Sequence, residues 1–221
     1  MTEKEVITFL EKNSSSKNVL GMARFGIRPK TKVYGVSVTT LRGLAKKVKK
    51  DYLLAEELYK TKIHECRILA TIIADPQKFT SKKMDEWAKD FDSWDICDLT
   101  CMNIFRYQPL AVKKCLQWSK EKEEYYKRAS FALMAALASD KKNQIPDATF
   151  ETFFPIIIKN SNDGRNYVKK AVNWALRQIG KRNKNLSKKA IKVAQEIIEL
   201  DTPLARFIGG NAWRELMAKG S

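Results

Sequence analysis

Apolar residues recur along most of the chain at the three- and four-residue spacing of amphipathic helices. This spacing predicts helices at 2–13, 38–50, 52–60, 64–74, 81–90, 93–106, 110–119, 122–139, 147–159, 164–182, 186–200 and 203–218. The breaks between segments carry prolines, namely Pro29, Pro76, Pro109, Pro146 and Pro203. Pro155 lies inside one segment and indicates a kink or a late helix start. No two alternating runs are joined by a hairpin turn dipeptide, so the pattern predicts an all-α fold.

A faint repeat also runs through the chain. The segments ECRILATIIAD, YKRASFALMAALASD and VKKAVNWALRQIG each place a basic residue near the start of an alanine-rich apolar helix. The last two are about 42 residues apart, the period of HEAT and armadillo helix pairs. Such pairs stack into a curved solenoid whose concave face is lined by the second helix of each pair. A compact helical bundle is the alternative. No linker composition indicates a second domain, so we expect one domain over residues 1–221.

The segment 164–182 predicts a helix with two different faces. On a helical wheel, Lys170, Arg177 and Lys181 all lie within about 40° of Trp174. The opposite side carries the core-facing stripe, which consists of Val168, Val172, Ala175, Leu176 and Ile179. One face is therefore assigned to the core, and the other presents a tryptophan among basic residues.

Positive charge is concentrated around this helix. The chain has 42 Lys and Arg against 25 Asp and Glu, a net charge of +17, and residues 164–195 include ten basic residues and no acid. Such clustering is typical of a surface that binds a polyanion, most often nucleic acid. The alternatives are a solvated lysine-rich surface and an anionic membrane surface. A membrane partner is disfavoured because the exposed helix face lacks an apolar stripe that could insert.

Few residues suit a metal site, a disulfide or a membrane anchor. No apolar run approaches the ~20 residues of a membrane span. The first residues predict a helix capped by Thr2 and Glu5 and not a signal peptide, which favours a cytoplasmic protein. Its four cysteines, Cys66, Cys97, Cys101 and Cys115, are then expected to be reduced and packed. The one histidine, His64, is expected at the surface of a helix start, and no metal site is predicted.

One carboxylate stands out in the segment 93–106. The wheel places Asp98 one turn after Trp94, on a face shared with Cys101 and Phe105. A carboxylate among apolar residues needs a partner. It could form an ion pair with an arginine, or it could lie in an aromatic pocket that receives a cationic ligand or transition state.

Arg128 is the third candidate. It shares a helix face with Ala132 and Ala135, whose small side chains would let a phosphate backbone approach the guanidinium. The alternative is a structural pair between Arg128 and Asp98.

Together these residues resemble the HEAT-like repeat DNA glycosylases of the AlkD type, which excise alkylated purines. The resemblance covers nearly the whole chain and is carried by GMARFGI, YGVSVTTLR, SWDICD, KRASFAL and, most strongly, KKAVNWALRQIGKRN. It implies a curved solenoid that holds duplex DNA containing alkylated purines in a concave basic groove. It also implies a monofunctional glycosylase that needs no cofactor or metal and acts as a monomer at the nucleoid.

The resemblance also assigns roles to residues. Asp98 would be the catalytic carboxylate, Trp94 and Trp174 would contact the deoxyribose of the lesion, and Arg128 would hold the backbone. Further DNA contacts would come from Phe25, Ser37, Thr39, Arg42, Tyr167, Lys170, Arg177, Lys181 and Arg182. The chain departs from the family pattern at Phe25, where tyrosine is usual, and at Asn166 and Tyr167, which replace paired phenylalanines. A non-catalytic scaffold that binds DNA or RNA through the same groove is the alternative function.

Overall fold

Helices make up all the regular structure of residues 1–219, which the computed structural model describes, and no strand occurs in that range. The all-α prediction is therefore confirmed. The chain forms two compact units, one spanning Met1–Gln108 and one beginning at Pro109. Each unit has its own buried core.

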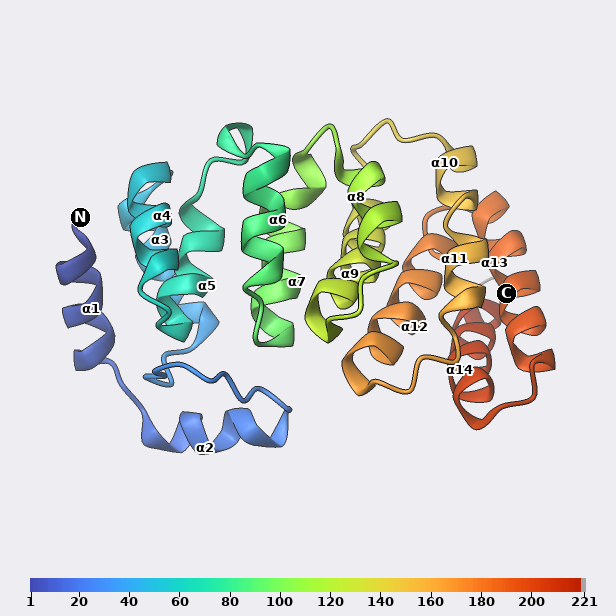
Figure 1. Cartoon of the computed structure of the whole chain (residues 1–221), viewed down its shortest axis with the longest axis horizontal. Coiled ribbons are helices and arrows are strands. Elements are labelled where there is room, and N and C mark those ends of the chain that lie inside the picture. Colours follow the sequence, from blue (N-terminus) through green and yellow to red (C-terminus); the bar gives the residue numbers. More distant parts are fainter. Residues whose placement is uncertain (220–221) are drawn as a thin grey trace. The chain divides into compact units, whose positions relative to one another are not determined.

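The N-terminal unit is built around α5, whose sequence HECRILATII is buried along nearly its whole length. Helices α3, α4 and α7 all pack against α5 (Figure 1). The unit consists of α1 (Glu3–Lys12), α2 (Ser16–Arg24), α3 (Val38–Val48), α4 (Tyr52–Lys60), α5 (His64–Ile73), the 3₁₀ turn η1 (Pro76–Lys78), α6 (Ser81–Lys89), α7 (Trp94–Asn103) and the 3₁₀ turn η2 (Phe105–Tyr107). A helix that is apolar on most sides has to lie inside a unit, which explains the position of α5.

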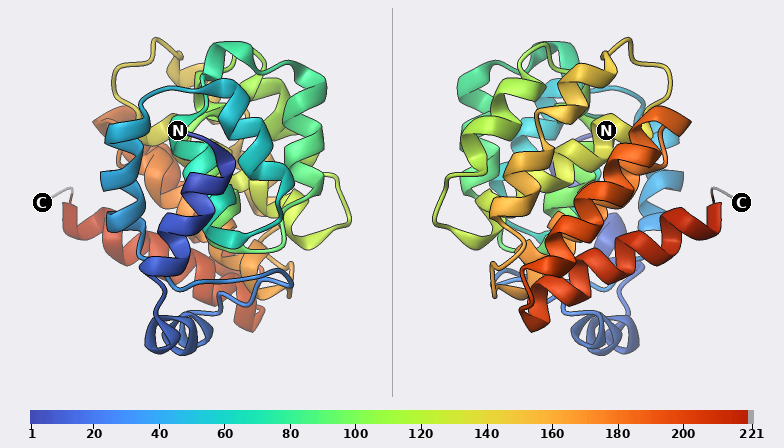
Figure 2. Two further views of the ribbon diagram at one scale, coloured as in Figure 1. Left: turned by 90° about the vertical axis from the view of Figure 1, so that its left-hand side faces the viewer. Right: turned by 90° about the vertical axis from the view of Figure 1, so that its right-hand side faces the viewer.

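The C-terminal unit is built around α9 and α12, which pack against each other more extensively than any other pair of helices in this unit. These are the two helices that the sequence places about 42 residues apart. The unit consists of α8 (Ala111–Trp118), α9 (Glu124–Ser139), α10 (Asp147–Glu151), α11 (Phe154–Lys159), α12 (Asn166–Gly180), α13 (Lys184–Glu199) and α14 (Pro203–Lys219). Figure 2 shows α13 and α14 diverging from their short connection as a helical hairpin.

The observed helices differ from the predicted ones at three main points. The predicted segment 93–106 ends as α7 at Asn103, and η2 follows it after Ile104, whose backbone is not helical. The segment 147–159 is divided into α10 and α11, and Pro155 occupies the first turn of α11, where its missing N–H group is tolerated. Helix α2 was not predicted from the sequence. None of its residues is buried, so it lacks the apolar stripe on which such a prediction depends. The predicted capping box at Thr2 and Glu5 is present.

Candidate nucleic-acid interface

The start of α7 is fixed by a buried polar network that reaches it from α5. Arg67, almost without exposed surface, donates hydrogen bonds to Asp92 Oδ1 at 2.7 Å and to the main-chain oxygen of Asp90 at 2.6 Å. His64 Nε2 lies 3.0 Å from Asp95 Oδ2. The other oxygen of Asp95 accepts hydrogen bonds from Ser93 Oγ and from the N–H of Ile96. These bonds hold the first turn of α7 in one position.

His64 is therefore not the surface residue that the sequence predicted. It is the first residue of α5, is 1% exposed, and contacts Asp95 of α7. The prediction was wrong because the partner, Asp95, lies 31 residues away and belongs to another helix. The sequence gave no role to Asp95 or Ser93, although the SWD run at the start of α7 was an available signal.

Trp94 and Asp98 lie on one face of α7 and are both half-buried. The same face continues to Cys101, which is fully buried; Phe105, which the wheel also placed on this face, is buried but lies beyond the end of α7, in η2. The face thus passes from solvent at the start of the helix to the core at its end. The Trp94 indole N–H donates to the main-chain oxygen of Phe25 at 3.1 Å, which fixes the plane of the indole. The structure accordingly presents an oriented tryptophan and a partly accessible carboxylate one helical turn apart.

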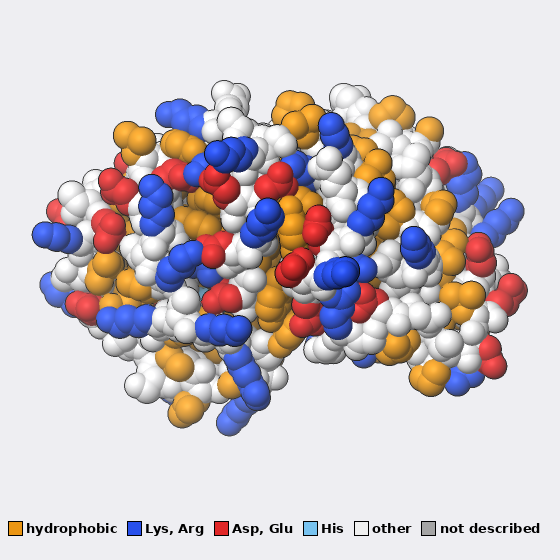
Figure 3. All heavy atoms as spheres, viewed as in Figure 1, with side chains coloured by type: hydrophobic (Ala, Val, Ile, Leu, Met, Phe, Trp, Pro, Cys, Tyr) orange, Lys and Arg blue, Asp and Glu red, His pale blue; other side chains and the backbone are white. Residues whose placement is uncertain are grey.

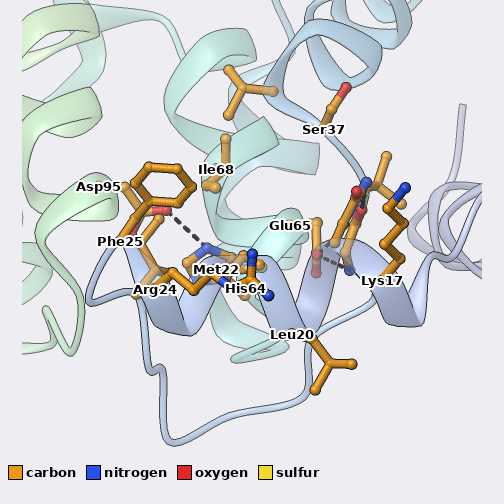
Figure 4. A pocket seen from close by; sticks show the side chains of 16 residues that line it. Lys17, Leu20, Met22, Arg24, Phe25, Ser37, His64, Glu65, Ile68 and Asp95 are labelled. Atoms are coloured by element: carbon orange, nitrogen blue, oxygen red, sulfur yellow. Dashed lines mark hydrogen bonds and ion pairs between the residues drawn. The ribbon is translucent and has the colours of Figure 1, made fainter.

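Phe25, whose main-chain oxygen accepts from Trp94, carries an exposed aromatic ring. It forms the C-cap of α2, and its side chain is 74% exposed. Figure 4 shows the ring at one end of a cavity of about 760 Å³ that α2 borders, with Asp95 and His64 beside it. Ser37 lines the same cavity, so two of the predicted DNA-contact residues share one site.

The remaining candidates of this unit lie at the first turns of α3. Ser37 is the N-cap, and its Oγ accepts the N–H of Thr40 at 3.1 Å. Thr39 and Arg42 are exposed. Beside this turn, the buried Glu65 carboxylate accepts main-chain N–H groups from Tyr34 and Gly35, the latter at 2.6 Å, and so fixes the segment that leads into α3.

In the C-terminal unit, α12 shows the two faces that the wheel predicted. The stripe from Val168 to Ile179 is fully buried, Trp174 is half-buried and Lys170 is exposed. With the amide oxygen of Gln178 turned toward them, Trp174 Nε1 and Lys181 Nζ both donate to that oxygen at 3.1 Å. The indole of Trp174 is therefore oriented, as that of Trp94 is.

Part of the positive charge on this face is neutralised from α14. Glu215 accepts from Arg177 Nη1 at 2.5 Å and from Lys181 Nζ at 2.9 Å. The hydrogen bonds from Lys181 and Arg177 lower the pKa of Glu215 to about 2, so this carboxylate is ionised at neutral pH. The sequence placed Arg177 and Lys181 on the basic face but gave no sign of Glu215, because this partner lies more than thirty residues away.

Arg128 and Tyr167 are brought together in the same unit. Arg128 Nη1 donates to the main-chain oxygen of Tyr167 at 2.6 Å, and the Tyr167 ring stacks on that of Tyr125. Arg128 itself is 5% exposed. The predicted role of Ala132 and Ala135 was wrong, because both are fully buried and neither offers surface to a phosphate backbone.

Arg182 has a structural environment that the sequence did not indicate. Its guanidinium donates to the main-chain oxygens of Ala138, Asp140 and Asn143 and lies over the ring of Phe150. These contacts hold the segment between α9 and α10 against the end of α12. Arg182 therefore has a structural role in this segment, and its DNA contact stays a prediction.

The other features that the sequence raised are metal-ligating side chains, cysteines and apolar helices. They contain no group of three or more His, Cys, Asp and Glu side chains that could hold a metal ion. The four cysteines are free and buried, as predicted, and burial raises the pKa of the Cys66 thiol to about 12. None of the described helices is long and apolar enough to cross a membrane. On the face drawn in Figure 3, Lys and Arg side chains lie scattered among acidic ones.

The chain is similar to known proteins both in sequence and in structure. A family model described as DNA alkylation repair enzyme matches residues 6–208. Among solved structures, the chain is similar to a member of a family related to the HEAT-like repeat DNA glycosylases with affinity for branched DNA structures. The two share 23% identity over 89% of this chain and 83% of that chain, with a TM-score of 0.79. This likeness confirms the HEAT-like repeat fold. A search of curated proteins gave no significant match.

Proposed function

Because this chain belongs to the DNA alkylation repair enzyme family, we propose that it is a DNA glycosylase. Its substrate would be duplex DNA carrying purines alkylated at N3 or N7. The reaction is hydrolysis of the N-glycosidic bond of the damaged nucleotide by water, without a metal or an organic cofactor. No residue is assigned as a Schiff-base nucleophile, so the proposed enzyme is monofunctional and does not cut the strand.

The chemistry requires a group that stabilises positive charge on a sugar. Alkylation at N3 or N7 makes the purine cationic and a good leaving group. When the bond to C1′ breaks, its electron pair leaves with the base, which becomes neutral, and the sugar becomes an oxocarbenium ion. Water then adds to C1′ and loses a proton. A carboxylate near C1′ lowers the barrier by stabilising the cation and by positioning that water.

The observation that carries this proposal is the pairing of Trp94 and Asp98 on α7. Both are partly accessible, and the indole is oriented by its hydrogen bond to Phe25. We assign Asp98 as the catalytic carboxylate. Trp94 contacts the lesion sugar, whose polarised C–H groups and spreading charge are attracted to an electron-rich ring face. The buried network behind α7 supports this role, because a preorganised site does not have to rearrange during the reaction.

Residues of the C-terminal unit supply the remaining roles in the proposal. Trp174 also contacts the lesion sugar, and its fixed indole supports that assignment. Arg128, supported by Tyr167, holds the backbone near the lesion. Lys170, Arg177 and Lys181 face phosphates of the duplex, and the ion pairs of Arg177 and Lys181 with Glu215 compete with their phosphate contacts. We further propose that both units are needed for activity, as one functional domain, and that the protein acts as a monomer at the nucleoid in the cytoplasm.

A base-release assay with the unaltered protein tests the activity. Duplex DNA treated with a methylating agent should release 7-methylguanine in a time-dependent and protein-dependent manner, and the strand should stay intact until alkali is added. Absence of release under conditions in which the protein binds the same DNA would contradict the proposal.

That outcome would favour a second function, a non-catalytic scaffold for DNA. One observation supports it: the similar solved structure belongs to proteins described as having affinity for branched DNA. A scaffold should bind a four-way junction more tightly than a linear duplex of equal length and should release no base. A glycosylase should release base from the linear duplex whatever its affinity for junctions.

A further inference from the structure

The C-terminal unit has a basic cavity, whose lining does not include Trp174, where α12 ends and α13 begins. Its volume is about 910 Å³. Its basic lining residues are Lys141, Lys181, Arg182, Lys184 and Lys188. No acidic residue is among those of the described chain that line it.

Three of these cations are available to a ligand. Lys181 is paired with Glu215, and Arg182 donates to main-chain oxygens, as described above. Lys141, Lys184 and Lys188 are exposed, and none of the three forms an ion pair within the described part of the chain. Three ammonium groups around one cavity repel one another, and an anionic ligand would remove that repulsion.

The cavity also has apolar lining residues. They are Ile191 of α13 and Leu216 and Met217 of α14. A lining that combines cations with apolar side chains fits a chain in which phosphates alternate with deoxyribose rings. A small inorganic anion would use the cations and leave the apolar residues uncovered.

We propose that this cavity, formed around Lys141, Lys184 and Lys188, binds the sugar–phosphate backbone of DNA beyond the nucleotide that Trp174 contacts. The inference rests on the proposed function, in which the exposed face of α12 meets DNA. Lys181 belongs to that face and also lines the cavity, so the two surfaces are continuous. Lys170 and Lys181 are separated by about 16 Å along the helix axis, at about 1.5 Å per residue. The cavity extends this row of cations past the end of the helix.

The test is the salt dependence of binding to undamaged duplex DNA. The full chain is compared with a variant that carries Lys141→Ala, Lys184→Ala and Lys188→Ala, and the dissociation constant is measured by fluorescence anisotropy over a series of salt concentrations. Loss of three phosphate contacts should make the log–log slope shallower by about 2.7, at about 0.9 per contact. All three side chains are exposed, so the variant should fold, and circular dichroism checks this.

A charge-matched control separates contact from net charge. Lys113, Lys120 and Lys159 are exposed in the same unit and do not line the cavity. Their triple alanine variant should keep the slope of the unaltered protein. Equal slopes for the cavity variant and the control variant would overturn the inference. The binding test uses undamaged DNA and therefore does not depend on excision. If the protein binds DNA but releases no base, the proposed function is contradicted, and the salt slopes still decide whether the cavity binds DNA.

Discussion

Replacing Glu215 with Gln should strengthen DNA binding and weaken the fold. The carboxylate bridges Arg177 and Lys181 on the exposed face of α12, at 2.5 and 2.9 Å. Removing its charge leaves both cations without their partner while the side chain keeps its volume. Each cation that then contacts a phosphate adds about 0.9 to the log–log salt slope, which corresponds to roughly eightfold tighter binding at 0.1 M salt.

The stability cost follows from the pKa of Glu215. The two hydrogen-bonded cations lower that pKa from 4.5 to about 2. The difference corresponds to about 3 kcal/mol at 1.36 kcal/mol per unit, and solvent screening around these partly exposed side chains reduces it to about 1–2 kcal/mol. Because the folded-state pKa is depressed, this stabilisation is complete above about pH 4.5 and is lost as the pH falls toward 2. Urea unfolding should therefore separate the variant from the unaltered protein at pH 7 and much less at pH 3.

The matched control is Glu196→Gln. Glu196 is exposed on α13 in the same unit, so the replacement changes the net charge equally without freeing a cation on α12. Fluorescence anisotropy with one duplex should show a steeper log–log dependence of the binding constant on salt for Glu215→Gln than for Glu196→Gln. If the two variants bind alike, or if Glu215→Gln binds more weakly than the unaltered protein, Arg177 and Lys181 do not contact DNA.

Two further predictions concern the framework that positions the candidate residues. Gly180→Ala should lower the free energy of unfolding by about 1–3 kcal/mol, because its Cβ would lie 2.6 Å from Leu216 Cδ1 and 2.9 Å from Ala190 Cβ. Gly43→Ala in α3 is the control: its added Cβ meets no atom within 4 Å, so the variant should be as stable as the unaltered protein or more stable. Equal losses of thermal stability in both variants would refute the packing argument. Glu65→Gln should lower the free energy of unfolding, measured with urea at pH 7, by about 1–3 kcal/mol, because a buried acceptor of main-chain N–H groups loses its charge. An unchanged urea midpoint would show that this carboxylate does not hold the segment before α3.

The sequence predicted those features that depend on neighbours within one helix. The period of apolar residues placed most helices, and the wheel of α12 separated the buried stripe from Trp174 because every residue concerned lies within four turns. The wheel of α7 likewise placed Trp94 and Asp98 on one face. The repeat offset identified α9 and α12 as neighbours.

Features that depend on partners from other helices were not predicted. Glu215 of α14 forms ion pairs with Arg177 and Lys181 of α12, and Asp95 of α7 contacts the buried His64. Arg182 donates hydrogen bonds to main-chain oxygens of the segment between α9 and α10. None of these partners lies within a helical turn of the residue it contacts, so no wheel could include it. Helix α2 was missed for a related reason: it buries no residue, and its sequence therefore carries no core-facing pattern.

The most direct measurement is the single-turnover rate of 7-methylguanine release by Asp98→Asn, at protein concentrations that saturate the DNA. Loss of the charge that stabilises the sugar cation should lower the rate constant by about 100-fold or more, while the affinity for the same duplex changes little. Asp201→Asn, an equal change at an exposed residue with a backbone φ of 53° that Asn tolerates, should keep the rate of the unaltered protein. A rate for Asp98→Asn within a few-fold of the unaltered protein would contradict the account, because the carboxylate beside Trp94 would then have no part in the reaction.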